Sequence, residues 1–529
     1  MRAGIIAGAL CAAGVTGLWA QQAPRRVTAL TRPERTEYAE TSTYADVMAF
    51  LAQVVPASPL MHRATEGYTY EGRSIPLIVV GKGLKDGSPE SVRGAHKLVV
   101  FLQGNIHAGE VEGKEALQIL LREIANGDHR AWLDSMVLLI NPIYNADGNE
   151  RITLTNRPRQ NGPIGGMGQR PNAQNFDLNR DHMKLESPEA KSFVSVLKRY
   201  DPQVTVDLHT TDGTDHAYYL TYSPPLHPNT DAGIIALLRR DLFPAVTKAI
   251  KQKHNWDFYY YGNVPGGVEQ NPGSERGWFT FDHRPRFNNN YVGLRNRVAI
   301  LSEAYAYASF EDRISATRWF VNEILDYARV HTSQIRRTVA HADSVSVVGT
   351  DLALRADLQR GDSVTILLGE VDEQRNPYTG RIVWIRKNVV HPEQMPEWGT
   401  FKATESTKAP SAYFVPPDLA PAINSLDDHG ITYTRLTAES SRNVERFVID
   451  SSSQAGNEFQ GHRERTLFGH YESASVTLPV GTVMVSVAQP LGRLAFTLLE
   501  PRSDDGLVDW NQLDRALAGQ KYYPIVRVP

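Results

Sequence analysis

Short, mainly apolar runs alternate with helical periods between residues 97 and 309. The runs lie at 98–102, 136–140, 204–208 and 298–301. Runs of this length suit strands that are buried on both faces of a mostly parallel sheet. Between them, apolar residues spaced three or four apart predict helices at 117–124, 188–200, 231–253 and 312–329. The pattern therefore predicts an α/β domain in which helices flank a sheet.

The pattern changes after about residue 340. Strand-like runs at 344–348, 364–368, 381–385, 475–478 and 482–487 are separated by turn residues, with one predicted helix at 417–429. A chain of 529 residues is longer than one core usually holds, so two domains are expected. We predict an α/β domain at 21–339 and a β-rich accessory domain at 340–529.

The first twenty residues have the features of a secretory signal peptide. Arg2 precedes an apolar run at 3–19, and Ala20 is a candidate cleavage position. The alternative is a buried or membrane-anchoring helix, although the run is short for a membrane span. No second apolar run approaches that length, so we expect export to the periplasm or the extracellular space, with no span after cleavage.

Composition argues against two classes of function. The only cysteine is Cys11, inside the predicted signal, so the mature chain is expected to have neither a disulfide nor a thiol nucleophile. The formal net charge is −3 and no long run of one charge sign stands out. A nucleic-acid binder would need a clustered basic face, so no nucleic-acid partner is predicted.

Candidate metal ligands stand just after the run at 98–102. His107 and Glu110 are three residues apart there, and zinc accepts both imidazole nitrogen and carboxylate oxygen. Among 16 histidines about one such pair is expected by chance, so this spacing alone is weak evidence. His209 and Glu303 follow the runs at 204–208 and 298–301. Ligands bind at the carboxyl ends of strands in open α/β sheets, so one shared site is predicted.

A further motif makes the pattern specific. Asp177, Asn179 and Arg180 stand in the order Asp-x-Asn-Arg between the two histidine segments. The ordered set of His-x-x-Glu, Asp-x-Asn-Arg, strand-end His and strand-end Glu resembles the zinc carboxypeptidases of the M14 family over roughly residues 44–329. Residues 498–510 also resemble the tails of some large bacterial members. The resemblance implies a mixed, mostly parallel eight-stranded sheet flanked by helices, with one zinc ion per chain.

The resemblance also implies the roles of residues at the metal. His107, Glu110 and His209 are the implied zinc ligands. Glu303 is the implied general base, which takes a proton from the attacking water. Asp177 is expected to accept a hydrogen bond from a ligand imidazole and so to fix its tautomer.

Further implied roles concern the substrate. Asn179 and Arg180 are expected to bind the C-terminal carboxylate of a peptide, because a planar guanidinium matches a carboxylate with two hydrogen bonds. The family also uses an upstream arginine at the oxyanion, and Arg170 is our candidate. The competing candidates are Arg157 and Arg159.

A tyrosine that caps the substrate is also expected upstream of the general base. Tyr291 is the predicted residue, although it lies closer to the base than the family spacing suggests. The tyrosines at 259–261 are alternative residues of the pocket or of the core. Glu112 and Glu115 fit a solvated helix face, and the His-x-Glu pairs at 462–464 and 470–472 are predicted to be surface groups.

The predicted activity is zinc-dependent hydrolysis of the C-terminal peptide bond of peptides that carry a free C-terminal carboxylate. The alternatives are a murein peptide amidase or an N-acyl amino-acid deacylase on the same fold, and a non-catalytic binding protein. The general base beside three ligands argues against a binding protein. The sequence leaves the preferred side chain and the oligomeric state open.

Overall fold

A computed structural model of the chain describes residues 26–265 and 275–529. The predicted signal segment, residues 1–20, lies outside the described residues. Among the helices of the described ranges, none combines the length and the apolar character that crossing a membrane requires.

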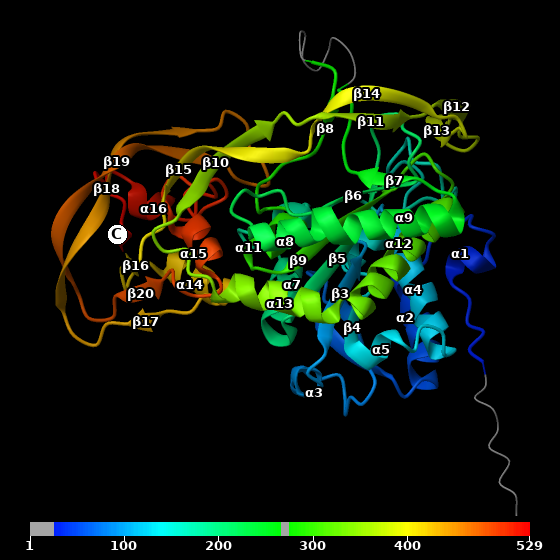
Figure 1. Cartoon of the computed structure of the whole chain (residues 1–529), viewed down its shortest axis with the longest axis horizontal. Coiled ribbons are helices and arrows are strands. Elements are labelled where there is room, and N and C mark those ends of the chain that lie inside the picture. Colours follow the sequence, from blue (N-terminus) through cyan, green and yellow to red (C-terminus); the bar gives the residue numbers. More distant parts are fainter. Residues whose placement is uncertain (1–25, 266–274) are drawn as a thin grey trace, which may run out of the picture.

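A mixed eight-stranded sheet forms the centre of the N-terminal half, in the order β1-β2-β4-β3-β5-β9-β6-β7 (Figure 1). Neighbouring strands β4, β3, β5 and β9 run parallel, whereas β1, β2 and β6 each form antiparallel pairs. The bounds are Met61–Tyr68 (β1), Ser74–Val80 (β2), Leu98–Gly104 (β3), Met136–Asn141 (β4), Val204–Thr211 (β5), Leu220–Ser223 (β6), Phe258–Tyr260 (β7) and Val298–Tyr305 (β9). The predicted mixed, mostly parallel sheet is confirmed.

Alternating side chains of the central strands enter two separate cores. Val99 and Phe101 belong to one buried cluster, whereas Val100 and Leu102 belong to the other. This period of two explains why the strands read as continuous apolar runs, since helices cover both faces. The helices are α2 (Tyr44–Val54), α4 (Glu112–Ala125), α9 (Phe243–His254) and α12 (Phe310–Val330) on one core, and α7 (Pro188–Tyr200) and α11 (Asn288–Leu294) on the other.

The C-terminal half is rich in strands, as predicted. A six-stranded sheet has the order β17-β20-β16-β21-β18-β19, and smaller sheets extend over the N-terminal half (Figure 1). The bounds are Asp351–Gln359 (β10), Ser363–Leu368 (β11), Val371–Arg375 (β12), Ile382–Arg386 (β13), His391–Trp398 (β14), Thr400–Lys408 (β15), Ala412–Val415 (β16), Thr434–Arg435 (β17), Ser440–Gln454 (β18), Arg465–Leu478 (β19), Val483–Ser486 (β20) and Val526–Val528 (β21). Helices α14 (Ala420–His429) and α15 (Gly492–Leu499) pack among them.

One predicted strand is wrong. The run at 344–348 begins on the last residue of helix α13 (Thr332–Ser344) and continues as a loop. Ile335, Val339 and Ala342 are buried at helical spacing, which extends this helix past residue 340. The division into domains at that residue stays a prediction, because β14 also pairs with β8 (Trp278–Phe279) and the two halves share one buried cluster.

Candidate metal and substrate site

The turn after β3 brings two predicted ligands to the edge of the sheet. His107 and Glu110 follow the strand directly, and both side chains are buried. The turn needs glycine at its centre, since a β-carbon on Gly109 would lie 2.8 Å from the carbonyl oxygen of Gly168 and 2.8 Å from Cδ of Arg157. Close packing of these loops therefore holds the turn that carries the histidine and the glutamate.

The remaining predicted residues come from two paired strands. His209 of β5 lies opposite Glu303 of β9 in the parallel register. Both stand near the carboxyl ends of their strands, as predicted. Parallel pairing alone thus places a histidine and a carboxylate on neighbouring strands at the same edge.

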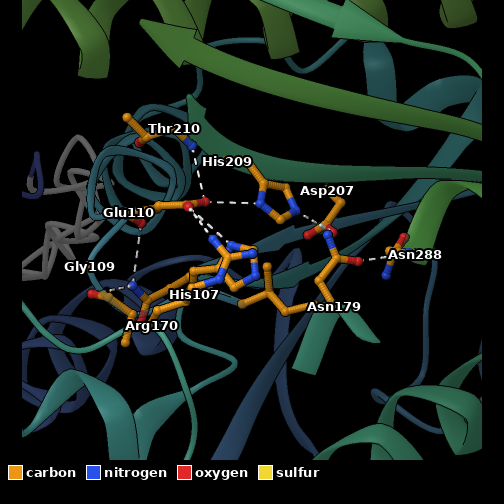
Figure 2. Close-up of polar contacts among 12 residues, drawn as sticks. His107, Gly109, Glu110, Arg170, Asn179, Asp207, His209, Thr210 and Asn288 are labelled. Atoms are coloured by element: carbon orange, nitrogen blue, oxygen red, sulfur yellow. Dashed lines mark hydrogen bonds and ion pairs between the residues drawn. The ribbon is translucent and has the colours of Figure 1, made fainter. Parts of the chain in front are cut away.

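The three predicted metal ligands meet in space. Their nearest donor atoms all lie within 4.8 Å of one another. Nδ1 of His107 is 3.0 Å from Oε1 of Glu110, and Nδ1 of His209 is 2.9 Å from Oε2 of the same carboxylate (Figure 2). Two imidazole nitrogens and one carboxylate form the donor set of a catalytic zinc site.

The far side of each imidazole is held by a carboxylate. Nε2 of His107 lies 2.9 Å from Oδ1 of Asp177, and Nε2 of His209 lies 2.8 Å from Oδ2 of Asp207. Each carboxylate accepts a hydrogen bond from Nε2–H, so the proton of the neutral imidazole lies on Nε2. The lone pair of each Nδ1 is then directed toward the common centre. The ligand atoms that the two histidines offer are therefore both Nδ1.

The charges around this centre favour a cation. Burial alone lowers the pKa of His209, but Asp207 and Glu110 raise it well above its usual range. Burial would raise the pKa of Glu110, but His107, Arg157 and hydrogen bonds from both histidines hold it well below its usual range. An ionised carboxylate beside two imidazoles that are each backed by a further carboxylate suits a divalent metal.

A pocket of about 290 Å³ opens beside these ligands. Its lining includes His107, Glu110, Arg157, Arg170, Asn179, Arg180, His209, Asp212, Tyr261, Phe281, Phe287 and Glu303. The guanidinium of Arg180 lies 3.8 Å from the centre of the Phe287 ring. Oδ1 of Asn179 accepts a hydrogen bond of 2.8 Å from the backbone N–H of Asn288, which leaves its amide NH₂ as the donor for a ligand (Figure 2).

Glu303 is half-buried in this pocket. Burial is the largest cause of the raised pKa of its carboxyl group, and the nearby Glu110 charge adds to it, while His209, Arg157 and Arg170 oppose the shift. The resulting pKa is about 8. A carboxyl group whose pKa lies near neutrality is suited to proton transfer.

The three candidate arginines have different surroundings. Arg157 is bound by three partners, since it donates to Glu110 at 2.9 Å, to Gln160 at 2.6 Å and to the carbonyl oxygen of Thr210 at 2.9 Å. Arg159 lies 4.6 Å from the ring of Trp384 and is not among the residues lining the pocket. Of the three arginines, Arg170 therefore remains the candidate for contact with the oxyanion.

Arg170 uses only one edge of its guanidinium. Nε and one terminal nitrogen each lie 2.9 Å from Oδ2 of Asp177, whereas the other terminal nitrogen is 3.7 Å from Glu110. The side chain is 43% exposed, compared with 15% for Arg157. One N–H edge of Arg170 therefore faces the pocket.

Tyr291 does not line the pocket, which corrects the prediction of a substrate contact. It is fully buried in α11, and its hydroxyl lies 2.8 Å from Nδ1 of His429. Nε2 of that histidine donates to the carbonyl oxygen of Met183 at 3.1 Å, so Nδ1 accepts the hydrogen bond from the tyrosine hydroxyl. Tyr261 lines the pocket instead, and burial raises the pKa of its hydroxyl to about 12.

The solvated helix face predicted at the start of α4 is also wrong. Glu112 is buried and lies 3.3 Å from Nε of Arg313. Glu115 is buried too and accepts hydrogen bonds from Thr41 and Ser42. Each carboxylate has a partner more than 70 residues away in the chain.

Sequence reasoning also missed the role of Asp207. Its partner His209 stands two residues later on the same strand, so both side chains point to the same face. That spacing is a local signal, and it identifies the carboxylate behind a strand-borne histidine ligand once the histidine is suspected.

Comparisons with known proteins agree with this geometry. Residues 47–214 match the family model described as zinc carboxypeptidase, Peptidase_M14. Carboxypeptidase 2 of Trichophyton tonsurans is 23% identical over 482 residues, which cover 87% of this chain and 81% of that protein. Carboxypeptidase 2 of Trichophyton rubrum is 23% identical over 480 residues, with the same coverage of 87% and 81%.

A solved metallo-carboxypeptidase from Burkholderia cenocepacia is 19% identical, with a TM-score of 0.41, and the match covers 56% of this chain and 71% of that one. The family match includes all three metal ligands and the Asp-x-Asn-Arg motif. The donor set and the pocket chemistry fit the single zinc ion of that family. The chain therefore carries a zinc carboxypeptidase domain of the peptidase M14 family.

Proposed function

We propose that this metallocarboxypeptidase removes the C-terminal residue of peptides, with Glu303 as the general base and Arg180 as the anchor for the substrate carboxylate. The observation that carries the proposal is the composition of one pocket. Three metal donors, a carboxyl group with a raised pKa and an Asn-Arg pair all line it. Hydrolysis at a chain end needs these functions together.

The Asn-Arg pair accounts for the choice of a chain end. Arg180 offers a planar fork of N–H donors, which matches a carboxylate with two hydrogen bonds. Asn179 adds its free amide NH₂ group. The Phe287 ring supports one face of the guanidinium and limits its movement. Only a peptide with a free terminal carboxylate satisfies both residues.

The chemical step then depends on three groups around the scissile bond. His107, Glu110 and His209 would hold the zinc ion, which would supply a Lewis acid for the carbonyl group and lower the pKa of bound water to roughly 7. Glu303 accepts a proton from the attacking water and returns it to the leaving amine. Arg170 donates its free N–H edge to the oxygen that gains negative charge.

We also infer that the chain is exported and that it is divided into two domains. We expect cleavage after Ala20 and export, because Arg2 and the apolar run at 3–19 have the pattern of a signal peptide. The N-terminal sequence of the secreted protein should then begin at Gln21. We also expect residues 21–339 to be the catalytic domain and residues 340–529 to be an accessory domain.

The role of Arg180 is tested by comparing a peptide acid with its amide. Arg180→Ala should lower kcat/KM for the free acid roughly 30-fold, since a charge-assisted hydrogen-bonded pair is lost. This factor corresponds to about 2 kcal/mol of transition-state stabilisation. The amide should be a poor substrate of the wild type and should change little in the variant. The measurement is steady-state kinetics on both peptides.

Arg180→Lys is the matched variant, because it keeps the charge and removes the fork. It should recover only part of the loss on the free acid. Equal losses on acid and amide in Arg180→Ala would contradict an exopeptidase and would favour an amidase.

A further inference from the structure

A hairpin of the C-terminal half reaches the substrate site. Strands β18 and β19 pair along their whole length, and residues 455–464 connect them. We call this segment the hairpin tip. Phe459 and His462 exchange backbone hydrogen bonds of 2.7 and 3.0 Å around the two-residue turn Gln460-Gly461. The turn therefore stands at the end of the tip.

The backbone conformation of Gln460 is unusual for its residue type. Its φ is 51° and that of Gly461 is 81°, so both central residues of the turn are left-handed, as in a type I′ turn. Glycine and asparagine adopt this conformation more readily than glutamine does. Oε1 of Gln460 accepts a hydrogen bond of 2.8 Å from the backbone N–H of Asp177. A residue with an energetically costly backbone conformation is thus found where its side chain binds Asp177, next to the substrate site.

The hydrogen bond to Gln460 holds Asp177, the residue directly before the segment that carries Asn179 and Arg180. Oδ1 of Asp177 accepts a hydrogen bond of 2.9 Å from the backbone N–H of Asn179 and also contacts His107. The short helix Leu178–Arg180 follows directly. Fixing the backbone of Asp177 therefore fixes the position from which Asn179 and Arg180 project.

A second C-terminal contact holds the segment that packs against Asn179 and Arg180. The backbone N–H and Nε of Arg286 each donate a hydrogen bond of 2.7 Å to the carboxylate of Asp505. A terminal nitrogen of Arg286 lies 2.6 Å from Glu464 of the hairpin tip. Arg286 is only 2% exposed, so these charges pair away from water. The next two residues are Phe287, which supports Arg180, and Asn288, which binds Asn179.

We propose that the C-terminal half positions the Asn179–Arg180 pair, with Gln460 and Asp505 as positioning residues for carboxylate-bearing substrates. The proposal rests on the proposed anchoring of the substrate by Arg180. Neither positioning residue lines the pocket. Gln460 acts through the backbone N–H of Asp177, and Asp505 acts through that of Arg286. If the loop adopts the binding geometry for only a fraction of the time, the apparent Kd for the ligand rises by the inverse of that fraction.

The test measures binding without turnover. The zinc-loaded Glu303→Gln protein serves as the background, and calorimetry gives Kd for a peptide acid and for its amide. The peptide is the one that the wild type cleaves fastest in a mixed pool. Gln460→Asn keeps a residue suited to the left-handed turn but is one methylene too short to reach Asp177. Asp505→Asn keeps the shape and removes the charge.

Each variant should weaken binding of the free acid about three- to tenfold, the factor expected for one ordinary hydrogen bond. Binding of the amide and zinc content should stay unchanged, and the Tm of Gln460→Asn should not fall. His462→Ala is the matched control, because its imidazole belongs to the same tip but contacts Glu186 at 2.8 Å. It should leave both affinities unchanged.

Two results would overturn the proposal, and they are distinguishable. If Arg180→Ala loses the preference for the acid but Gln460→Asn and Asp505→Asn keep wild-type affinity, the positioning role is wrong and the proposed function stands. If Arg180→Ala keeps the preference for the acid, both the anchor and the positioning role are wrong.

Discussion

Glu303→Gln should lower kcat by about 10²–10⁴-fold, the range that a positioned general base contributes. Glutamine keeps the size and the hydrogen bonds of the side chain but cannot accept a proton. Glu303 lies opposite His209 in the sheet and lines the pocket, yet it is not needed to complete the three-ligand set. Zinc content, folding and substrate affinity should therefore change little while turnover is lost.

Asp212→Asn is the matched control for that change. Asp212 is an exposed carboxylate of the same pocket, so its loss should leave kcat within a few fold. Steady-state kinetics and metal analysis of both variants decide the assignment. Loss of zinc in Glu303→Gln would make the residue a ligand, and near-normal kcat would place the base elsewhere.

His107→Ala should remove both zinc and activity. One of three protein ligands is lost, and a catalytic zinc supplies several kcal/mol to the reaction, so we expect turnover to fall at least about 10³-fold. The wild type should carry one zinc ion per chain. His391→Ala, an exposed histidine paired with Glu370, should retain full metal and activity.

A graded variant tests the arrangement behind the ligands. Asp207→Asn should weaken zinc affinity about 10–100-fold without abolishing it, because the carboxylate orients His209 and does not bind the metal. Competition with a chelator measures this affinity. Full zinc occupancy in a His107→Ala, His209→Ala double variant would show that the metal is held elsewhere.

The sequence was sufficient for the parts of this site that depend on local order. Apolar runs identified β3, β5 and β9, and residues just after or at the ends of these strands share one edge of the sheet by the geometry of parallel pairing. His107, His209 and Glu303 could be brought together by that rule. The assignment of Asp177 and the Asn-Arg pair depended on the family resemblance.

What could not be predicted depends on contacts between distant segments. The side chain of Tyr291 is held in the core by His429, which lies 138 residues later in the chain. Glu112 is buried because Arg313, 201 residues away, reaches it. The contact between Gln460 and Asp177 spans 283 residues. Periodicity along the chain carries no information about such partners.

Hydrolysis of the C-terminal peptide bond is tested most directly by mass analysis of the products from a mixed pool of peptides. The zinc-loaded protein should shorten free-acid peptides by single residues from the C-terminus, and it should leave their amides intact. Cleavage at internal bonds, removal of an N-acyl group, or equal cleavage of acids and amides would contradict the account.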